Sequence, residues 1–142
     1  TIIKPIGPTP PPILANGTPD LAIRVVEIGI ITSDDATGTF TATSSVFRNQ
    51  QAAIVFEVTN NGTAVAKQWD FVANLPINTD GYYRSDMQSS LAPGDRVRFT
   101  MGFKDVNARG ENKAVFTVDP DNALRDSNHT NDSATATIFR ID

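Results

Sequence analysis

The sequence contains no cysteine, no long apolar run and no run of basic residues. Without cysteine the chain can form neither a disulfide framework nor a thiolate zinc site, and it has no cysteine nucleophile. No stretch of about 18 apolar residues is present, so the sequence predicts no membrane insertion. The net charge is −4 and the 12 basic residues are scattered. This argues against nucleic acid as a partner, because phosphate backbones require a concentrated basic face.

Histidine occurs only once, so acid–base catalysis near neutral pH would depend on His129. A Ser-His-Asp set can be written with Ser127 or Ser133 and Asp126, but triad members normally come from separate elements rather than from neighbouring positions. The sequence also has no Gly-x-Ser-x-Gly elbow, and no element offers a buried acid beside an aromatic sugar platform. We therefore predict that the chain is not an enzyme and has no catalytic residues.

The length of 142 residues and the 39% share of hydrophobic residues suit one folded domain. Residues 1–19, "TIIKPIGPTPPPILANGTP", hold six of the nine prolines and are interpreted as a semi-rigid linker ahead of a domain at 20–142. An alternative reading makes Pro8 to Pro12 a ligand for a proline-binding groove. The chain starts at Thr1 without methionine, so we expect an excised piece of a longer, processed polypeptide.

Alternating and branched apolar residues predict strands over 21–31, 52–60, 66–76, 95–103, 113–119 and 133–141, with weaker ones at 39–47 and 82–85. Val97, Phe99, Met101 and Phe103 illustrate the pattern, because every second residue faces the same side of a strand. Trp69 is the expected central plug of the core. No segment indicates a helix.

Two turn signals separate these runs. Asn-Gly in "NNGT" (60–63) predicts a tight hairpin, and Pro-Gly in "LAPGD" (91–95) predicts a type II turn. Short strands joined by such turns predict an all-β fold, namely an antiparallel β-sandwich of two sheets.

The ordered segments "DLAI", "VFEVTNNGTAVA", "LAPGDRVRFT" and "AVFTVDPDNALRDSNHTND" resemble the bacterial cell-adhesion-related domain called CARDB. That resemblance covers residues 20–141. It implies an immunoglobulin-like sandwich of about seven strands that occurs in repeats on large extracellular proteins of bacteria and archaea. Asp126 stands where the family more often has glutamate.

This resemblance implies an extracellular or cell-surface location and neighbouring domains of the same polypeptide as partners. Within it, we expect a structural spacer. Two alternatives stay open: a recognition module that binds carbohydrate or protein through its end loops, with or without calcium at the 119–132 loop, and an accessory domain of a secreted hydrolase. The domain organisation of the parent protein would separate these three.

The segment "DPDNALRDSNHTND" (119–132) concentrates hard oxygen donors between two predicted strands, and calcium takes six to eight such oxygens. Its candidate metal ligands are Asp119, Asp121, Asn122 and Asp126. The spacing does not fit an EF-hand, since Leu124 replaces the glycine at position 6 and Thr130 the glutamate at position 12. Asp and Asn side chains also satisfy their own backbone in turns, so a structural turn anchored by Leu124 is the favoured interpretation. The sequence predicts no cofactor, and calcium is the one candidate.

Other candidates have simple structural readings. Asp34 and Asp35 could lie beside the same loop but are typical of a solvated loop tip. Tyr82 and Tyr83 could contact a ligand, although an edge strand whose rings cover the rim of the sandwich is favoured. Glycosylation sequons occur at Asn16, Asn61, Asn128 and Asn131. With the bacterial resemblance, we interpret them as ordinary turn sequences, because Asn, Gly and Thr are common in the turns of β proteins.

Overall fold

The computed structural model describes residues 4–6, 17–32, 38–126 and 128–142. These residues form no helix, and so none that is long and apolar enough to cross a membrane. Their strands are β1 (Lys4–Ile6), β2 (Leu21–Ile31), β3 (Phe40–Ala42), β4 (Ser45–Val46), β5 (Gln51–Asn60), β6 (Phe71–Asn74), β7 (Tyr82–Arg84), β8 (Arg96–Phe103), β9 (Gly110–Val118) and β10 (Ser133–Arg140).

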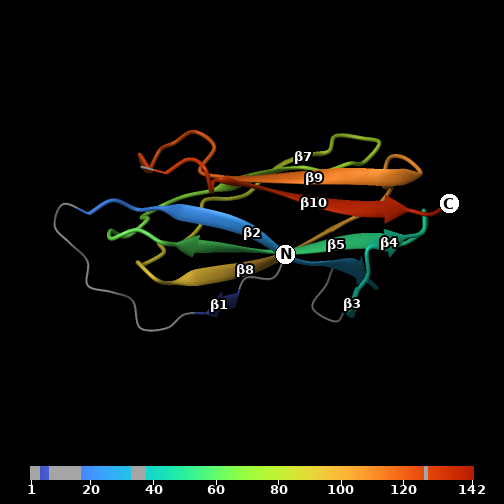
Figure 1. Cartoon of the computed structure of the whole chain (residues 1–142), viewed down its shortest axis with the longest axis horizontal. Coiled ribbons are helices and arrows are strands. Elements are labelled where there is room, and N and C mark those ends of the chain that lie inside the picture. The colour runs from blue at the N-terminus through green and yellow to red at the C-terminus, as the bar shows by residue number, and fades with distance from the viewer. Residues whose placement is uncertain (1–3, 7–16, 33–37, 127) are drawn as a thin grey trace.

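Two stacked sheets make up the fold (Figure 1). The first sheet has the order β1-β8-β5-β2-β3 and the second the order β4-β10-β9-β6-β7. This confirms the predicted all-β sandwich. Ten strands are described where about seven were expected, and the four at the sheet edges, β1, β3, β4 and β7, have only two or three residues each. β4 pairs parallel with β10, so the second sheet is mixed rather than antiparallel.

The core between the sheets follows from strict alternation. In β8 the buried side chains are the predicted Val97, Phe99, Met101 and Phe103. Within the core, the ring of Phe56 of β5 lies 4.5 to 5.2 Å, centroid to centroid, from rings of both sheets: Phe71, Phe99 and Phe116. Stacked and edge-on rings of this kind contribute beyond the area they bury.

Trp69 is buried in the core as predicted. Its ring meets Phe99 edge-on at 6.2 Å, and its indole Nε1 donates a hydrogen bond to the carbonyl oxygen of Ser89. The strand predicted over 66–76 is regular only at β6. Its first half makes isolated bridges at Ala66 and Trp69, because here the chain crosses from the first sheet to the second.

The Asn-Gly hairpin prediction was wrong. β5 and β6, which flank the connection, belong to different sheets, and neither Asn61 nor Gly62 has the positive φ that such a hairpin needs. Gly62 is required for another reason, since a Cβ there would collide with the backbone of Thr18 and Asp20. The type II turn is confirmed: Gly94 has φ 84°, and the amide of Asp95 donates to the carbonyl of Ala92.

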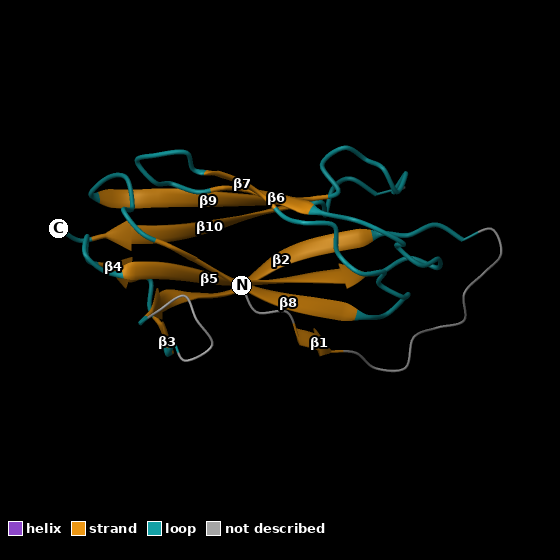
Figure 2. Cartoon of the chain, turned by 180° about the vertical axis from the view of Figure 1, so that it is seen from behind, coloured by secondary structure: helices purple, strands orange, loops and turns teal. Residues whose placement is uncertain are grey.

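The weakly predicted segments are edge strands. The single strand expected over 39–47 is divided into β3, which pairs with β2 in the first sheet, and β4, which pairs with β10 in the second. β7 is the expected edge strand beside β6. Within the predicted linker, β1 pairs antiparallel with β8 (Figure 2). Pro8 to Pro12 lie outside the described residues, and the boundary between linker and domain stays a prediction.

Candidate functional site

The four segments that carry the family resemblance converge at one end of the sandwich, which we call the motif end. β2 begins there at Leu21, which pairs with Asn60 at the end of β5. The amide of Ile23 donates to the carbonyl of Asn131, just before β10. Asn60 in turn contacts the 91–95 turn, since its amide donates to the carbonyl of Asp95. Residues distant in the sequence therefore form one local cluster.

Asn60 is the centre of this cluster and is fully buried. Its side-chain Nδ2 donates to the carbonyl oxygens of Ala64 (2.8 Å) and Leu91 (2.9 Å). Its Oδ1 accepts the amides of Gly62 (2.9 Å) and Asp20 (3.2 Å). All hydrogen-bonding capacity of this carboxamide is thus spent on backbone groups of three connections, which explains why an Asn-x-Gly segment belongs at this position.

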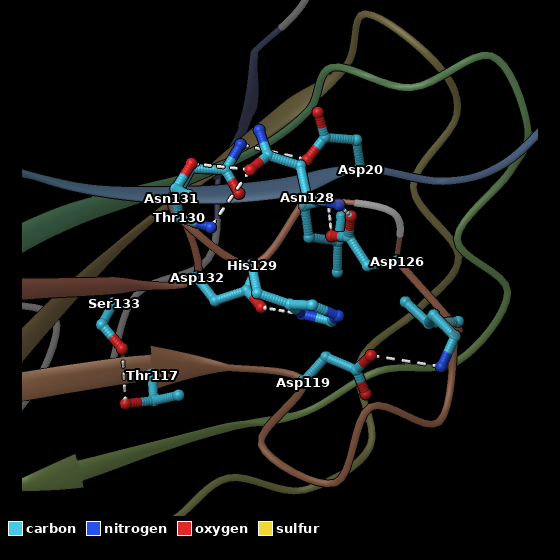
Figure 3. Close-up of polar contacts among 12 residues, drawn as sticks. Asp20, Thr117, Asp119, Asp126, Asn128, His129, Thr130, Asn131, Asp132 and Ser133 are labelled. Atoms are coloured by element: carbon cyan, nitrogen blue, oxygen red, sulfur yellow. Dashed lines mark hydrogen bonds and ion pairs between the residues drawn. The ribbon is translucent and has the colours of Figure 1, made fainter.

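Asp126 ties the loop between β9 and β10 to the start of β2. Its Oδ2 accepts the amide of Leu21 and its Oδ1 the amide of Asn128, both at 2.8 Å. Burial raises the pKa of Asp126, and the two amide hydrogen bonds oppose that shift. Asn131 adds a further link, since its Nδ2 donates to Oδ1 of Asp20 at 3.0 Å (Figure 3).

Asp119 holds the first turn of the same loop. Its two carboxylate oxygens accept the amides of Ala123 (3.0 Å) and Leu124 (3.1 Å), and its own amide donates to the carbonyl of Asp70. Asp119 and Asn122 have positive φ, a conformation that Asp and Asn tolerate better than most residues. Leu124 packs against the core. The predicted structural turn, with its leucine anchor, is therefore present.

Asp121 pairs with Arg84 on the surface. It lies 2.7 Å from Nη2 of Arg84, whose Nε lies 2.7 Å from Oδ2 of Asp70. The hydrogen bonds to Asp121 and Asp70 raise the pKa of Arg84, so this guanidinium stays charged. Because Asp121 is 68% exposed, its ion pair with Arg84 contributes little to stability.

The donors predicted for calcium are thus divided among different partners. Asp119 and Asp126 accept backbone amides, Asp121 pairs with Arg84, and Asn122 contributes a left-handed backbone position. Across residues 17–32, 38–126 and 128–142, no group of three or more His, Cys, Asp or Glu side chains is arranged to hold a metal ion. These four residues therefore take part in different contacts in this structure, and calcium binding stays an untested prediction.

His129 lies on the surface and forms no triad with the described residues named for one. Its Nδ1 is 2.8 Å from Oδ2 of Asp132, and this hydrogen bond raises the pKa of His129 (Figure 3). Asp126 faces Leu21 and Asn128 instead, and Oγ of Ser133 hydrogen bonds with Oγ1 of Thr117. Ser127 lies outside the described residues.

The remaining predicted positions are exposed or serve the backbone. Oδ1 of Asn128 accepts hydrogen bonds from the amide and hydroxyl of Thr130, as expected for an Asn side chain in a turn. Tyr82 and Tyr83 are exposed on β7, and the ring of Tyr83 contacts Phe71 at 6.0 Å between centroids. Asn16, Asp34 and Asp35 lie outside the described residues.

Sequence reasoning missed a basic cluster on the outer face of the first sheet. Glu57 of β5 is buried there between the side chains of Arg24, Arg96 and Arg98. The arginines are scattered in the sequence, and only strand pairing brings them together. Their outward positions in the alternating strands were the available signal.

Hollows on the surface of the described residues include two that differ in their lining. One, of about 240 Å³, lies at the basic cluster and is lined by Arg24, Glu57, Thr59, Asn61 and Arg96, together with Ala22 and Ile23. The other, of about 500 Å³, lies near the end of the sandwich opposite the motif end and is lined by uncharged groups and Lys104. The first combines charge with unpaired polar groups, whereas the second has a single charged residue in its lining.

Comparisons with known proteins agree with the fold. The CARDB family model matches residues 18–136. The chain is similar to the crystal structure of a CARDB domain from Pyrococcus furiosus in complex with di-metal ions, with 19% identity, a TM-score of 0.66, and coverage of 87% of this chain and 94% of that one. A solution NMR structure of the same domain gives 18% identity, a TM-score of 0.63, and coverage of 87% and 96%. A search of curated proteins found no match.

Proposed function

Since the chain belongs to the CARDB family, a family of β domains, we propose that it is a non-catalytic module of a larger extracellular protein from a bacterium or archaeon. It acts there as an adhesion-related structural spacer. Its partners are then the neighbouring domains of the same polypeptide.

The placement of the first and last long strands carries this proposal. β2 begins at the motif end, where the amide of Ile23 donates a hydrogen bond to the carbonyl of Asn131. β10 starts from the same end. β10 then runs the length of the sandwich and ends beside β4, at the far end (Figure 1). β1 runs antiparallel to β8 along the first sheet, so the chain reaches the motif end from alongside the domain. The first long strand then begins at one end and the last long strand ends at the other, an arrangement that suits modules placed in a line.

The polar residues of the motif end support a structural role as well. Asn60, Asp119 and Asp126 direct their side-chain hydrogen bonds to backbone groups of the domain itself. The related Pyrococcus furiosus domain was solved with di-metal ions. In this chain we propose that the 119–132 loop is held by its own hydrogen bonds, without an ion.

Two experiments test the spacer. In small-angle X-ray scattering, a head-to-tail tandem of the 142-residue chain should have nearly twice the maximum dimension of the single chain. A tandem that folds back to a compact particle would contradict the linear arrangement.

In the source organism, an antibody to the domain should label intact cells or the culture medium. Labelling confined to the cytosol would exclude an extracellular role.

A further inference from the structure

The basic cluster on the outer face of the first sheet is built by strand register. Arg24 of β2 and Arg98 of β8 both stand directly opposite Glu57 of β5. Nη2 of Arg24 lies 3.1 Å from Oε1 of Glu57, and Nη2 of Arg98 lies 3.1 Å from Oε2. Glu57 thus uses both oxygens on these two guanidinium groups.

Arg96 is the third cation of the cluster, and it is left almost without a partner among the described residues. Its Nη1 lies 4.0 Å from Oε1 of Glu57, and its buried Nε has no hydrogen-bond partner there. Three guanidinium groups around one carboxylate leave a local excess of two positive charges on a protein whose net charge is −4. An excess of this kind attracts anions, and a guanidinium matches the geometry of a carboxylate.

The hollow beside Arg96 contains further unused polar groups. The hydroxyl of Thr59 and the carboxamide of Asn61 border it, and within the described part of the chain neither side chain makes a hydrogen bond. At about 240 Å³ the hollow is smaller than typical pockets for drug-sized ligands, which begin near 300 Å³. One ring with a single carboxylate and several hydroxyls suits this size and these groups.

We propose that this hollow binds a carboxylated sugar unit of an acidic polysaccharide. The sugar carboxylate pairs with Arg96, close to Arg24, and ring hydroxyls hydrogen bond with Thr59 and Asn61. Glu57 keeps the arginine side chains in place and leaves the site with net positive charge. This site lies on the outer face of the first sheet, and Asn61 of the connection after β5 borders it. It is independent of the spacer role, so its failure would leave that role standing.

Titration of the ¹⁵N-labelled 142-residue chain with sodium D-glucuronate, followed by NMR, tests the proposal. Shifts should centre on residues 22–24, 57–61 and 96, and glucose should cause none of them. Arg96→Gln should weaken glucuronate binding at least about tenfold, which corresponds to 1.4 kcal/mol. Arg109→Gln removes an exposed arginine elsewhere and should leave binding unchanged.

Thr59→Val distinguishes a sugar site from a simple anion site. It should weaken glucuronate binding several-fold and leave the binding of acetate and inorganic phosphate unchanged. If acetate or phosphate binds as tightly as glucuronate and Thr59→Val has no effect, the site takes bare anions and the sugar proposal is wrong. Tighter binding of a poly-glutamate peptide, equal losses in Arg109→Gln, or no binding by the wild type would also overturn it. Unchanged melting temperatures confirm that the variants are folded.

Discussion

Replacing Asn60 with aspartate tests whether this one side chain holds the motif end together. The change keeps the size of the side chain and its Oδ1, which accepts the amides of Gly62 and Asp20. It replaces the Nδ2 donor by an oxygen that faces the carbonyl oxygens of Ala64 and Leu91, at 2.8 and 2.9 Å. Two hydrogen bonds are lost, and three oxygens then meet in a fully buried position.

The expected loss is large for a single substitution. Each of the two lost hydrogen bonds costs about 1 kcal/mol. Among the described residues, the carbonyl oxygen of Ala64 is left without a donor, which costs about 1–3 kcal/mol in addition. The carbonyl oxygen of Leu91 still accepts the amide of Ala66. We expect Asn60→Asp to lower the free energy of unfolding by roughly 3–5 kcal/mol at pH 7, which is a major part of the 5–15 kcal/mol typical of a domain.

The loss should also depend on pH in a defined direction. The buried carbonyl oxygens disfavour the charged carboxylate, so the pKa of the carboxyl group introduced by Asn60→Asp should be higher in the folded than in the unfolded state. The penalty is then complete above the folded pKa, and it shrinks as pH falls toward the unfolded value near 3.9. Protonation also restores a donor for one of the two carbonyl oxygens.

Urea unfolding at pH 7 and pH 4.5, followed by fluorescence of the buried Trp69, measures both effects. Asn61→Asp is the matched control, because Asn61 is exposed and should change stability by less than about 0.5 kcal/mol. A loss below 1 kcal/mol in Asn60→Asp, or a gap to the wild type that widens as pH falls, would refute the reasoning.

Three further predictions concern the loop, the core and the surface histidine. Millimolar calcium or a chelator should leave the melting temperature unchanged, since the 119–132 carboxylates already have partners; a clear rise with calcium would show ion binding to the folded state. Phe56→Ala should cost about 3–5 kcal/mol in urea unfolding, whereas Phe139→Ala, at an exposed position, should be nearly neutral. The hydrogen bond to Asp132 raises the pKa of His129 in the folded state. The free energy of unfolding of the wild type, relative to His129→Gln, should therefore be greatest below about pH 6.5 and decline as pH rises through the folded pKa of His129. No decline would contradict this pairing.

Most of the fold could be predicted because each long strand carries its own period. The alternation of Val97, Phe99, Met101 and Phe103 sets strand and buried face at once, and the Pro-Gly turn before it depends only on local φ preferences. The Asn-Gly error has the opposite cause. A change of sheet between 60 and 71 is decided by the packing of the whole sandwich, and no local rule contains it.

The candidate sites divide in the same way. The backbone role of Asp119 could be predicted, because an Asp turn is satisfied within five residues. The link from Asp126 to Leu21 spans 105 positions, and the three arginines around Glu57 come from two separate strands. Contacts of that kind depend on register, which the order of residues alone does not supply.

The division of residues 40–46 between β3 and β4 has a consequence for how the molecule comes apart. This short segment hydrogen bonds to one layer and, two residues later, to the other. If one sheet separates from its edge strand at this end of the sandwich, the covalent connection between β3 and β4 also displaces the edge strand of the other sheet. Amide protons of β3 and β4 should then exchange with solvent as a single cooperative unit, because both edge strands open together.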